Sequence, residues 1–223
     1  FQKSVMANDE LILYTIFRSS AAWRVRIALH LKGLSFESKT VKWDDEKVMA
    51  DIRAKNPAVR IPVLVHNGKV LTESLAIVEY IDEVFPGPKL LPVDPFVRHQ
   101  ARAIALHVTA GIQPLQIGRT NNKLEEMAGE GKGAEWAAYW LHRGLAELEE
   151  MVAKTAGKYC VGDEVTIADV VIPSILNNAR RWNADISTFP TLIKIDKNLA
   201  EIPAFIAAHA LNQPDAPASK QPF

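Results

Sequence analysis

The sequence is poor in cysteine: Cys160 is the only one among 223 residues, so no disulfide can form within one chain. This is compatible with a reducing compartment, and we expect a cytoplasmic protein. Cys160 lies in the glycine-flanked stretch AGKYCVGDE, and no histidine accompanies it in the sequence. A small buried residue is therefore a better interpretation of Cys160 than a nucleophile.

An excess of one charge is also absent, because 26 basic and 26 acidic residues give a formal net charge of zero. This balance gives no reason to expect nucleic acid or an anionic membrane as a partner. No apolar run approaches the roughly 18 residues that span a bilayer. The six histidines show neither an HExxH motif nor a close pair, so we predict no metal site. The start shows no signal-peptide core, and Met6 resembles a natural start, so residues 1–5 are expected to be an added remnant.

The first part of the chain alternates strand-like and helix-like patterns, which predicts an α/β domain over residues 6–86. The expected elements are a strand at 11–17, a helix at 22–32, a strand at 36–41, a weak helix at 44–55, strands at 61–65 and 70–72 joined by an Asn-Gly hairpin, and a helix at 73–84. The expected order is therefore βαβαββα.

The second part shows helical periodicity almost without strands, after a Pro- and Gly-rich linker at 87–94. We expect an all-helical domain over 95–223, with helices at 95–118, 134–155, 166–180, 190–200 and 202–209. Pro114 should kink or end a turn in the first of them. The stretch NNKLEEMAGEGKGAE is interpreted as a mobile loop, the tail NQPDAPASKQPF as extended, and TIAD at 166–169 as a structural capping box.

The turn from Arg18 to Ala22, between the first strand and the first helix, is one candidate site. Unpaired amides at a helix N-terminus stabilise an anion such as a thiolate. The hydroxyl of Ser19 or Ser20 could donate a hydrogen bond to that anion. Either serine could instead only cap the helix, and the local pattern leaves both readings open.

Two further candidates follow along the chain. Pro62 opens the short strand IPVLV and can be cis, so that the Ile61 backbone would face a peptide-like ligand, although an edge-strand proline is the alternative. Glu73 and Ser74 begin the next helix, where they could hold an amino group and a carboxylate or serve only as caps.

The order of these three candidates within βαβαββα resembles a thioredoxin-like glutathione-binding domain, and with the helical half the whole chain resembles a cytosolic glutathione transferase. SSAAWRVRIAL is similar to the zeta-class signature, as are NPAVRIPVL, SLAIVEYIDE, GIQPLQ, YCVGDEVTIADV and QPDAP, which together cover residues 10–217. Zeta-class enzymes are maleylacetoacetate isomerases, which act late in phenylalanine and tyrosine catabolism.

The resemblance implies a role for each residue of the glutathione site. Ser19 matches the serine whose hydroxyl activates the glutathione sulfur, and Ser20 shapes the same turn. The Ile61 backbone, just before cis-Pro62, matches the partner of the cysteinyl part. Glu73 and Ser74 match the pair that holds the γ-glutamyl end.

The resemblance also implies residues for the substrate. Gln113, in the helical half, matches a residue near the glutathione and substrate site. Arg181 matches an arginine that binds a substrate carboxylate, although its neighbour Arg180 could take that place, and Arg18 is a possible helper. Ala21 stands where the family has its signature cysteine, which bears on isomerase activity but not on glutathione binding. Many zeta-class members also have Gln at the position of Glu73.

These assignments imply an isomerase that uses glutathione as its cofactor, acts on a small diacid and also has transferase activity. One alternative is maleylpyruvate isomerase, whose bacterial members often carry His at the position of Gln113. Others are a transferase or dehalogenase of α-halo acids and, in a different class, a non-catalytic glutathione-binding protein, which only Ala21 favours. The resemblance implies a homodimer.

Overall fold

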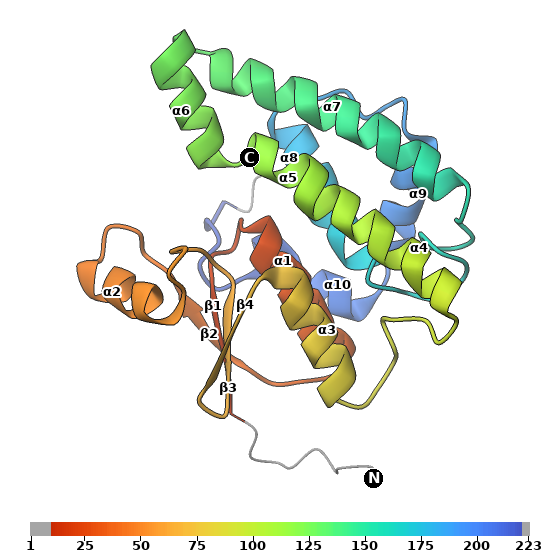
Figure 1. Cartoon of the computed structure of the whole chain (residues 1–223), viewed down its shortest axis with the longest axis horizontal. Coiled ribbons are helices and arrows are strands. Elements are labelled where there is room, and N and C mark those ends of the chain that lie inside the picture. The colour runs from red at the N-terminus through yellow and green to blue at the C-terminus, as the bar shows by residue number, and fades with distance from the viewer. Residues whose placement is uncertain (1–9, 220–223) are drawn as a thin grey trace. The chain divides into compact units, whose positions relative to one another are not determined.

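The computed structural model describes residues 10–219, which form two compact units (Figure 1). The first unit contains the residues up to Lys89 and those from Ile202 onward, and the second runs from Leu90 to Glu201. We expected one helical domain over 95–223. Its last segment instead groups with the first unit, because α10 (Pro203–Ala208) packs on the first helix of that unit. The expected remnant, residues 1–5, lies outside the described residues.

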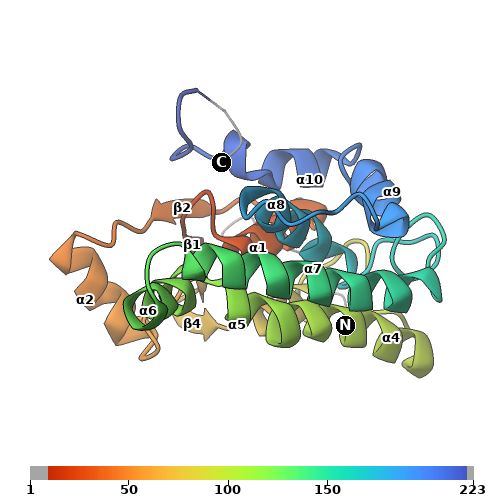
Figure 2. The same cartoon turned by 90° about the horizontal axis from the view of Figure 1, so that it is seen from above.

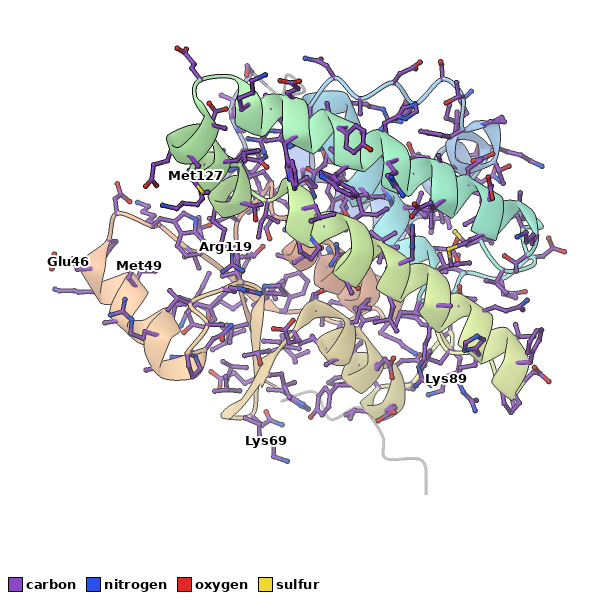
Figure 3. All side chains as sticks on the ribbon, turned by 45° about the horizontal axis from the view of Figure 1, so that its top comes forward. Glu46, Met49, Lys69, Lys89, Arg119 and Met127 are labelled. Carbon is purple, nitrogen blue, oxygen red and sulfur yellow. The ribbon has the colours of Figure 1, made fainter. Side chains whose placement is uncertain are left out.

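Four short strands form the sheet of the first unit in the order β2-β1-β3-β4. They are β1 (Leu11–Thr15), β2 (Glu37–Thr40), β3 (Val63–His66) and β4 (Lys69–Thr72). β1 pairs with β2 in parallel, and the other two pairings are antiparallel. Asn67 and Gly68 form the predicted hairpin with φ of 48° and 77°. Figure 3 shows Lys69 pointing outward at this hairpin end of the sheet.

Helices cover both faces of the sheet. They are α1 (Ser20–Leu31), α2 (Glu46–Lys55) and α3 (Ser74–Val84). Ile52 of α2 packs with Tyr14 and Val63 of the sheet. Since side chains alternate along a strand, Leu13 and Leu64 point to the other face, where α1 and α3 pack side by side (Figure 1). The βαβαββα order predicted from the sequence is confirmed.

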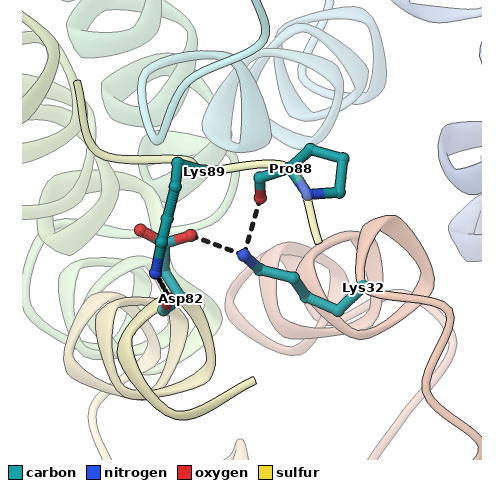
Figure 4. Close-up of polar contacts among 4 residues, drawn as sticks. All are labelled: Lys32, Asp82, Pro88 and Lys89. Carbon is teal, nitrogen blue, oxygen red and sulfur yellow. Dashed lines mark hydrogen bonds and ion pairs between the residues drawn. The ribbon is translucent and has the colours of Figure 1, made fainter. Parts of the chain in front are cut away.

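A buried ion pair lies where the chain leaves the first unit (Figure 4). The Lys32 ammonium, at the end of α1, lies 2.7 Å from the Asp82 carboxylate of α3, and the two side chains are 0% and 3% exposed. Lys32 Nζ also donates to the carbonyl of Pro88 at 2.6 Å, and Lys89 Nζ donates to the Asp82 carbonyl. The segment that follows α3 is thereby tied to both helices.

The second unit is built from helices alone, apart from an isolated bridge between Ala156 and Gly162. They are α4 (Pro95–Leu106), the π-helix η1 (His107–Ile112), α5 (Gln113–Gln116), α6 (Gly118–Ala128), α7 (Lys132–Ala153), the 3-10 turn η2 (Asp169–Val171), α8 (Ile172–Arg181) and α9 (Pro190–Leu199). α7 is the longest, and it runs beside α4, η1 and α5 (Figure 2). In the described residues, no helix is long and apolar enough to cross a membrane.

The structure corrects three expectations for the helical part. The stretch interpreted as a mobile loop is mostly helix: the Glu125 carboxylate accepts from the amides of Gly131 and Gly133 at 2.7 and 3.0 Å and closes a tight corner between α6 and α7. The helix expected at 95–118 is interrupted by η1, ahead of Pro114, which sits in the first turn of α5. The tail up to residue 219 forms the short turn η3 (Ala210–Asn212) and further turns, and is not extended.

The capping box at 166–169 is present as predicted. The Asp169 carboxylate accepts from the Thr166 amide at 2.8 Å, from its hydroxyl at 3.1 Å and from the amide of Cys160 at 2.9 Å. Burial raises the pKa of Asp169, and burial together with the nearby Asp169 raises the pKa of the Cys160 thiol well above its usual range. Because Cys160 is also fully buried, its predicted role as a small packing residue agrees with the structure.

Candidate functional site

Strand register brings the three candidate segments of the first unit to one end of the sheet. Tyr14, near the end of β1, pairs with Val63 at the start of β3, and Val63 pairs with Thr72 at the end of β4. The turn after β1, the segment before β3 and the turn after β4 therefore leave the sheet at the same end, opposite the hairpin. A ligand that spans this end can meet all three.

Ser19 is the N-cap of α1. Its Oγ accepts a hydrogen bond from the Ala22 amide at 3.2 Å, and its side chain is half-buried. A hydroxyl that accepts one hydrogen bond still has its own O–H to donate. The two readings left open by the sequence are therefore compatible: Ser19 caps the helix, and its O–H can still serve an anion at the helix N-terminus. Ser20 is the first residue of α1 and is buried.

The Ile61–Pro62 peptide bond is cis, as the sequence suggested. A tight turn precedes it: Asn56 Oδ1 accepts from the Ala58 amide at 3.0 Å, and its Nδ2 donates to the Arg60 carbonyl at 2.9 Å. Ile61 packs against the cluster around Tyr14, and β3 begins only after Pro62. The Ile61 backbone thus lies outside the strand ladder at the site's end of the sheet.

Glu73 and Ser74 form the third segment. Glu73 has φ of 65°, a left-handed conformation that costs a residue with a side chain ~1–3 kcal/mol and that clusters at functional sites. Its side chain is exposed, and no side chain caps the N-terminus of α3. An uncapped helix start beside a carboxylate suits a ligand that carries both a negative and a positive group.

Sequence reasoning missed a buried arginine that supports this segment. Arg24 Nη1 donates to Ser74 Oγ at 3.0 Å, and Arg24 is 1% exposed. Burial lowers the pKa of Arg24 to about 9, so the side chain is still charged at neutral pH. The quoted signature WRVRIAL contains Arg24, but only the fold shows that the side chain points inward and fixes Ser74.

Two candidates, Gln113 and Arg181, lie in the second unit on α5 and α8. A side-chain hydrogen bond joins these two helices. Asn178 Nδ2 of α8 donates to Gln116 Oε1 of α5 at 3.2 Å. Gln113 is three residues before Gln116, and Arg181 is three residues after Asn178, so each candidate shares a helix face with one partner of this bond. The structure thereby couples the helix that carries Gln113 to the helix that carries Arg181.

Arg180 and Arg181, between which the sequence left a choice, are both exposed at the end of α8. Arg180 Nη2 donates to Asp196 Oδ2 at 2.9 Å, which commits that guanidinium to α9. Arg181 is exposed and lies over the Trp182 ring at 5.3 Å. In the first unit, Arg18 is exposed and Ala21 is half-buried in the first turn of α1. Residues 10–219 contain no group of three or more His, Cys, Asp and Glu side chains that could hold a metal ion.

The sheet order, the cis-proline before β3 and the helical second unit define the class of cytosolic glutathione transferases. The chain belongs to the glutathione S-transferase family, and its predicted resemblance to the zeta class is confirmed. The family models described as glutathione S-transferase N-terminal domain and C-terminal domain match residues 13–89 and 120–209.

Relatives and solved structures agree with this assignment. A probable maleylacetoacetate isomerase of Caenorhabditis elegans is 47% identical over 94% of this chain and 98% of its own length. The crystal structure of maleylacetoacetate isomerase from Anaeromyxobacter dehalogenans, with glutathione bound in the active site, has a TM-score of 0.86 and 41% identity, covering 94% of this chain and 99% of that one. The holo structure of maleyl pyruvate isomerase, a bacterial zeta-class glutathione S-transferase, has a TM-score of 0.87 and 33% identity, covering 92% and 100%.

Proposed function

We propose that this protein is a glutathione-dependent isomerase that converts maleylacetoacetate to fumarylacetoacetate in phenylalanine and tyrosine catabolism, with transferase activity as well. The observation that carries the proposal is the single sheet end shared by Ser19, Ile61 and the Glu73–Ser74 pair. A maleylacetoacetate isomerase at 41% identity, with glutathione in its active site, and a probable maleylacetoacetate isomerase at 47% identity support it.

The residues at this sheet end fit glutathione. The Glu73 carboxylate would bind the ammonium of the γ-glutamyl group. Ser74 and the uncapped N-terminus of α3 would bind the carboxylate of that group. The Ile61 backbone would pair with the cysteinyl part, and the Ser19 hydroxyl would donate to the sulfur.

When bound, glutathione would supply a thiolate nucleophile whose reversible addition turns the activated double bond of the substrate into a single bond that can rotate. A free thiol with a pKa of ~8.5 is only a few per cent ionised at neutral pH, so the protein must favour the anion. We assign this to the Ser19 O–H and the N-terminus of α1. Arg181, helped by Arg18, would bind the substrate carboxylate and stabilise developing negative charge, and Gln113 would line the same region.

Three other readings are outcomes of the test. Maleylpyruvate isomerisation is favoured by the structural match to a zeta-class enzyme of that name, whereas Gln113 favours maleylacetoacetate, because the bacterial maleylpyruvate isomerases often have His there. A transferase or dehalogenase of α-halo acids is the second reading. The third is a non-catalytic glutathione-binding protein, which only Ala21, in place of the family cysteine, favours. An assay of both diacids and of a chloro acid separates these activities.

The test is glutathione-dependent isomerisation of maleylacetoacetate by the parent, Ser19→Ala and Ala21→Cys. We expect the parent to turn over and Ser19→Ala to lose about 10²–10³ in kcat, as when one hydrogen bond to a developing anion is removed. Ser38→Ala, on the exposed strand β2, is the matched control and should keep parental kcat. Activity in Ala21→Cys but not in the parent would mean that the missing cysteine is required. The absence of turnover in all three would refute the isomerase.

A homodimer and a cytoplasmic location complete the proposal. Both are implied by the resemblance to the zeta class, and the single buried Cys160 is compatible with a reducing compartment.

A further inference from the structure

Arg26 is a second buried arginine of the signature helix, and it binds the turn that carries Ser19. Its Nη1 donates to the Thr15 hydroxyl at 2.9 Å and to the Ile16 carbonyl at 3.4 Å, and its Nη2 donates to the Phe17 carbonyl at 3.0 Å. The same Ile16 carbonyl accepts the Ser19 amide at 3.0 Å. Arg26 thus binds two backbone carbonyls and one hydroxyl of the segment that leads to Ser19.

Asp215, from a distant part of the sequence, also binds this turn. Its Oδ2 accepts the Phe17 amide at 2.9 Å across 198 residues, so both backbone groups of Phe17 have fixed partners. Asp215 belongs to the stretch QPDAP, which the sequence comparison with the zeta class singled out and for which the proposed function has no use.

The last segment of the chain is tied to the same arginine. Arg26 Nε donates to the carbonyl of Ala208 at the end of α10, at 3.2 Å. The rings of His209 and Trp23 form a T-shaped contact, with ring centroids 4.9 Å apart. The segment that packs on α1 therefore supplies an acceptor to Arg26, the Ala208 carbonyl, and an acceptor to the turn itself, the Asp215 carboxylate.

Charge supports this arrangement. Arg26 is fully buried, which lowers its pKa to about 10, while the Asp215 carboxylate opposes that shift and favours the charged guanidinium. The Arg26 guanidinium is therefore charged at neutral pH, and its hydrogen bonds to the Ile16 and Phe17 carbonyls are charge-assisted.

We infer that Arg26 and Asp215 are positioning residues for Ser19: together they clamp the Ile16–Phe17 backbone so that the Ser19 hydroxyl is held where the glutathione sulfur binds. The inference rests on the proposed role of Ser19. The segment from Ile202 onward, which contains Asp215, would thus help to position the turn that activates the thiol. A catalytic group displaced by ~1 Å can lose about 10² in rate, so such a clamp matters to activity.

The test uses Asp215→Ala, which removes the acceptor of the Phe17 amide, and Asp215→Asn, whose side-chain oxygen can still accept it. The readout is the pKa of the thiol of bound glutathione, taken from the ultraviolet absorbance of the thiolate during a pH titration. We expect Asp215→Ala to raise this pKa towards ~8.5 and to lower kcat about three- to tenfold at neutral pH. The Kd of glutathione should change less than about twofold, because Glu73 and Ser74 are untouched. Asp215→Asn should restore most of both values.

Asp94→Ala is the matched control, because the Asp94 carboxylate also accepts two backbone amides, at the start of α4 in the other unit. It should lower thermal stability without moving the thiol pKa. If Asp215→Ala lowers thermal stability but keeps the thiol pKa of the parent, the proposed positioning role is wrong and Asp215 is only structural. If Ser19→Ala also leaves that pKa unchanged, the proposed role of Ser19 fails instead.

Discussion

At the scale of single residues, the sequence identified the groups that could touch a ligand but not the groups that hold them. Ser19, Glu73 and Ser74 were predictable because helix starts after strands recruit hydroxyl and carboxylate side chains for known reasons. The roles of Arg24 and Arg26 were not predictable. A charged residue in an apolar helix can point to solvent or inward, and only the contacts across the fold decide which.

His30 gives a prediction for pH. Burial and the charge of Arg26 lower the pKa of His30 below its ordinary 6.5, and its ring packs against Phe36. Between the folded and unfolded pKa values the unfolded chain binds more protons, so the free energy of unfolding rises with pH there. The contribution of His30 is therefore complete above pH 6.5 and falls as the pH drops below that value. Replacement by Gln should flatten the acid side of a plot of unfolding free energy against pH.

Denaturant unfolding of the parent and His30→Gln at a series of pH values measures this slope. His99→Gln is the control, because His99 is also a helical histidine but is exposed. It should leave the slope of the parent unchanged. A slope that is the same in all three proteins would contradict the assignment to His30.

At the scale of elements, apolar periodicity and turn residues predicted all four strands and the helices of the first unit, and α1 and α3 each bury a broad apolar face. It did not predict η1. A π-helix has no distinctive hydrophobic period over six residues, and here it forms where α7 comes unusually close. A Cβ atom on Gly144 of α7 would lie 2.5 Å from Ile112 Cγ1, at the end of η1. His107, at the start of η1, donates to the Gly144 carbonyl at 3.1 Å.

Gly144→Ala should therefore destabilise the protein. Alanine gains ~1 kcal/mol of helix propensity over glycine, but Ile112 is 1% exposed and cannot move aside without repacking that costs ~1–3 kcal/mol. Because Ile112 precedes Gln113, we also expect weaker binding of substrate. Thermal unfolding and KM measure the two effects. Gly118→Ala is the control at a helical glycine with no atom within 4 Å, and it should be neutral or slightly stabilising. Equal stability of the two variants would contradict the proposed close approach.

At the scale of the whole molecule, the sequence predicted an α/β part and a helical part but not where the last segment belongs. The composition of QPDAP suggests an extended tail, whereas its role depends on Asp215 reaching Phe17 across 198 residues. A contact between residues so far apart in the sequence produces no periodic pattern from which it could be predicted. The unit boundary at Lys89 and Leu90 does fall within the predicted linker at 87–94.

The buried ion pair of Lys32 and Asp82 ties the segment just before that boundary to α1 and α3. A double-mutant cycle of Lys32→Met and Asp82→Leu measures its contribution to stability. Each single change leaves the other charged group buried without this partner and should cost ~3–5 kcal/mol of unfolding free energy. The double variant removes both charges and should cost much less than the sum. The exposed pair of Lys123 and Glu126, with side chains 62% and 68% exposed, should show a coupling below ~1 kcal/mol in the same cycle. Additive costs at Lys32 and Asp82 would mean that the pair does not act as one unit. Strong coupling would mean that Lys32 and Asp82 stabilise the first unit as one pair. The segment that follows α3 would depend on this pair, because Lys32 also donates to the Pro88 carbonyl.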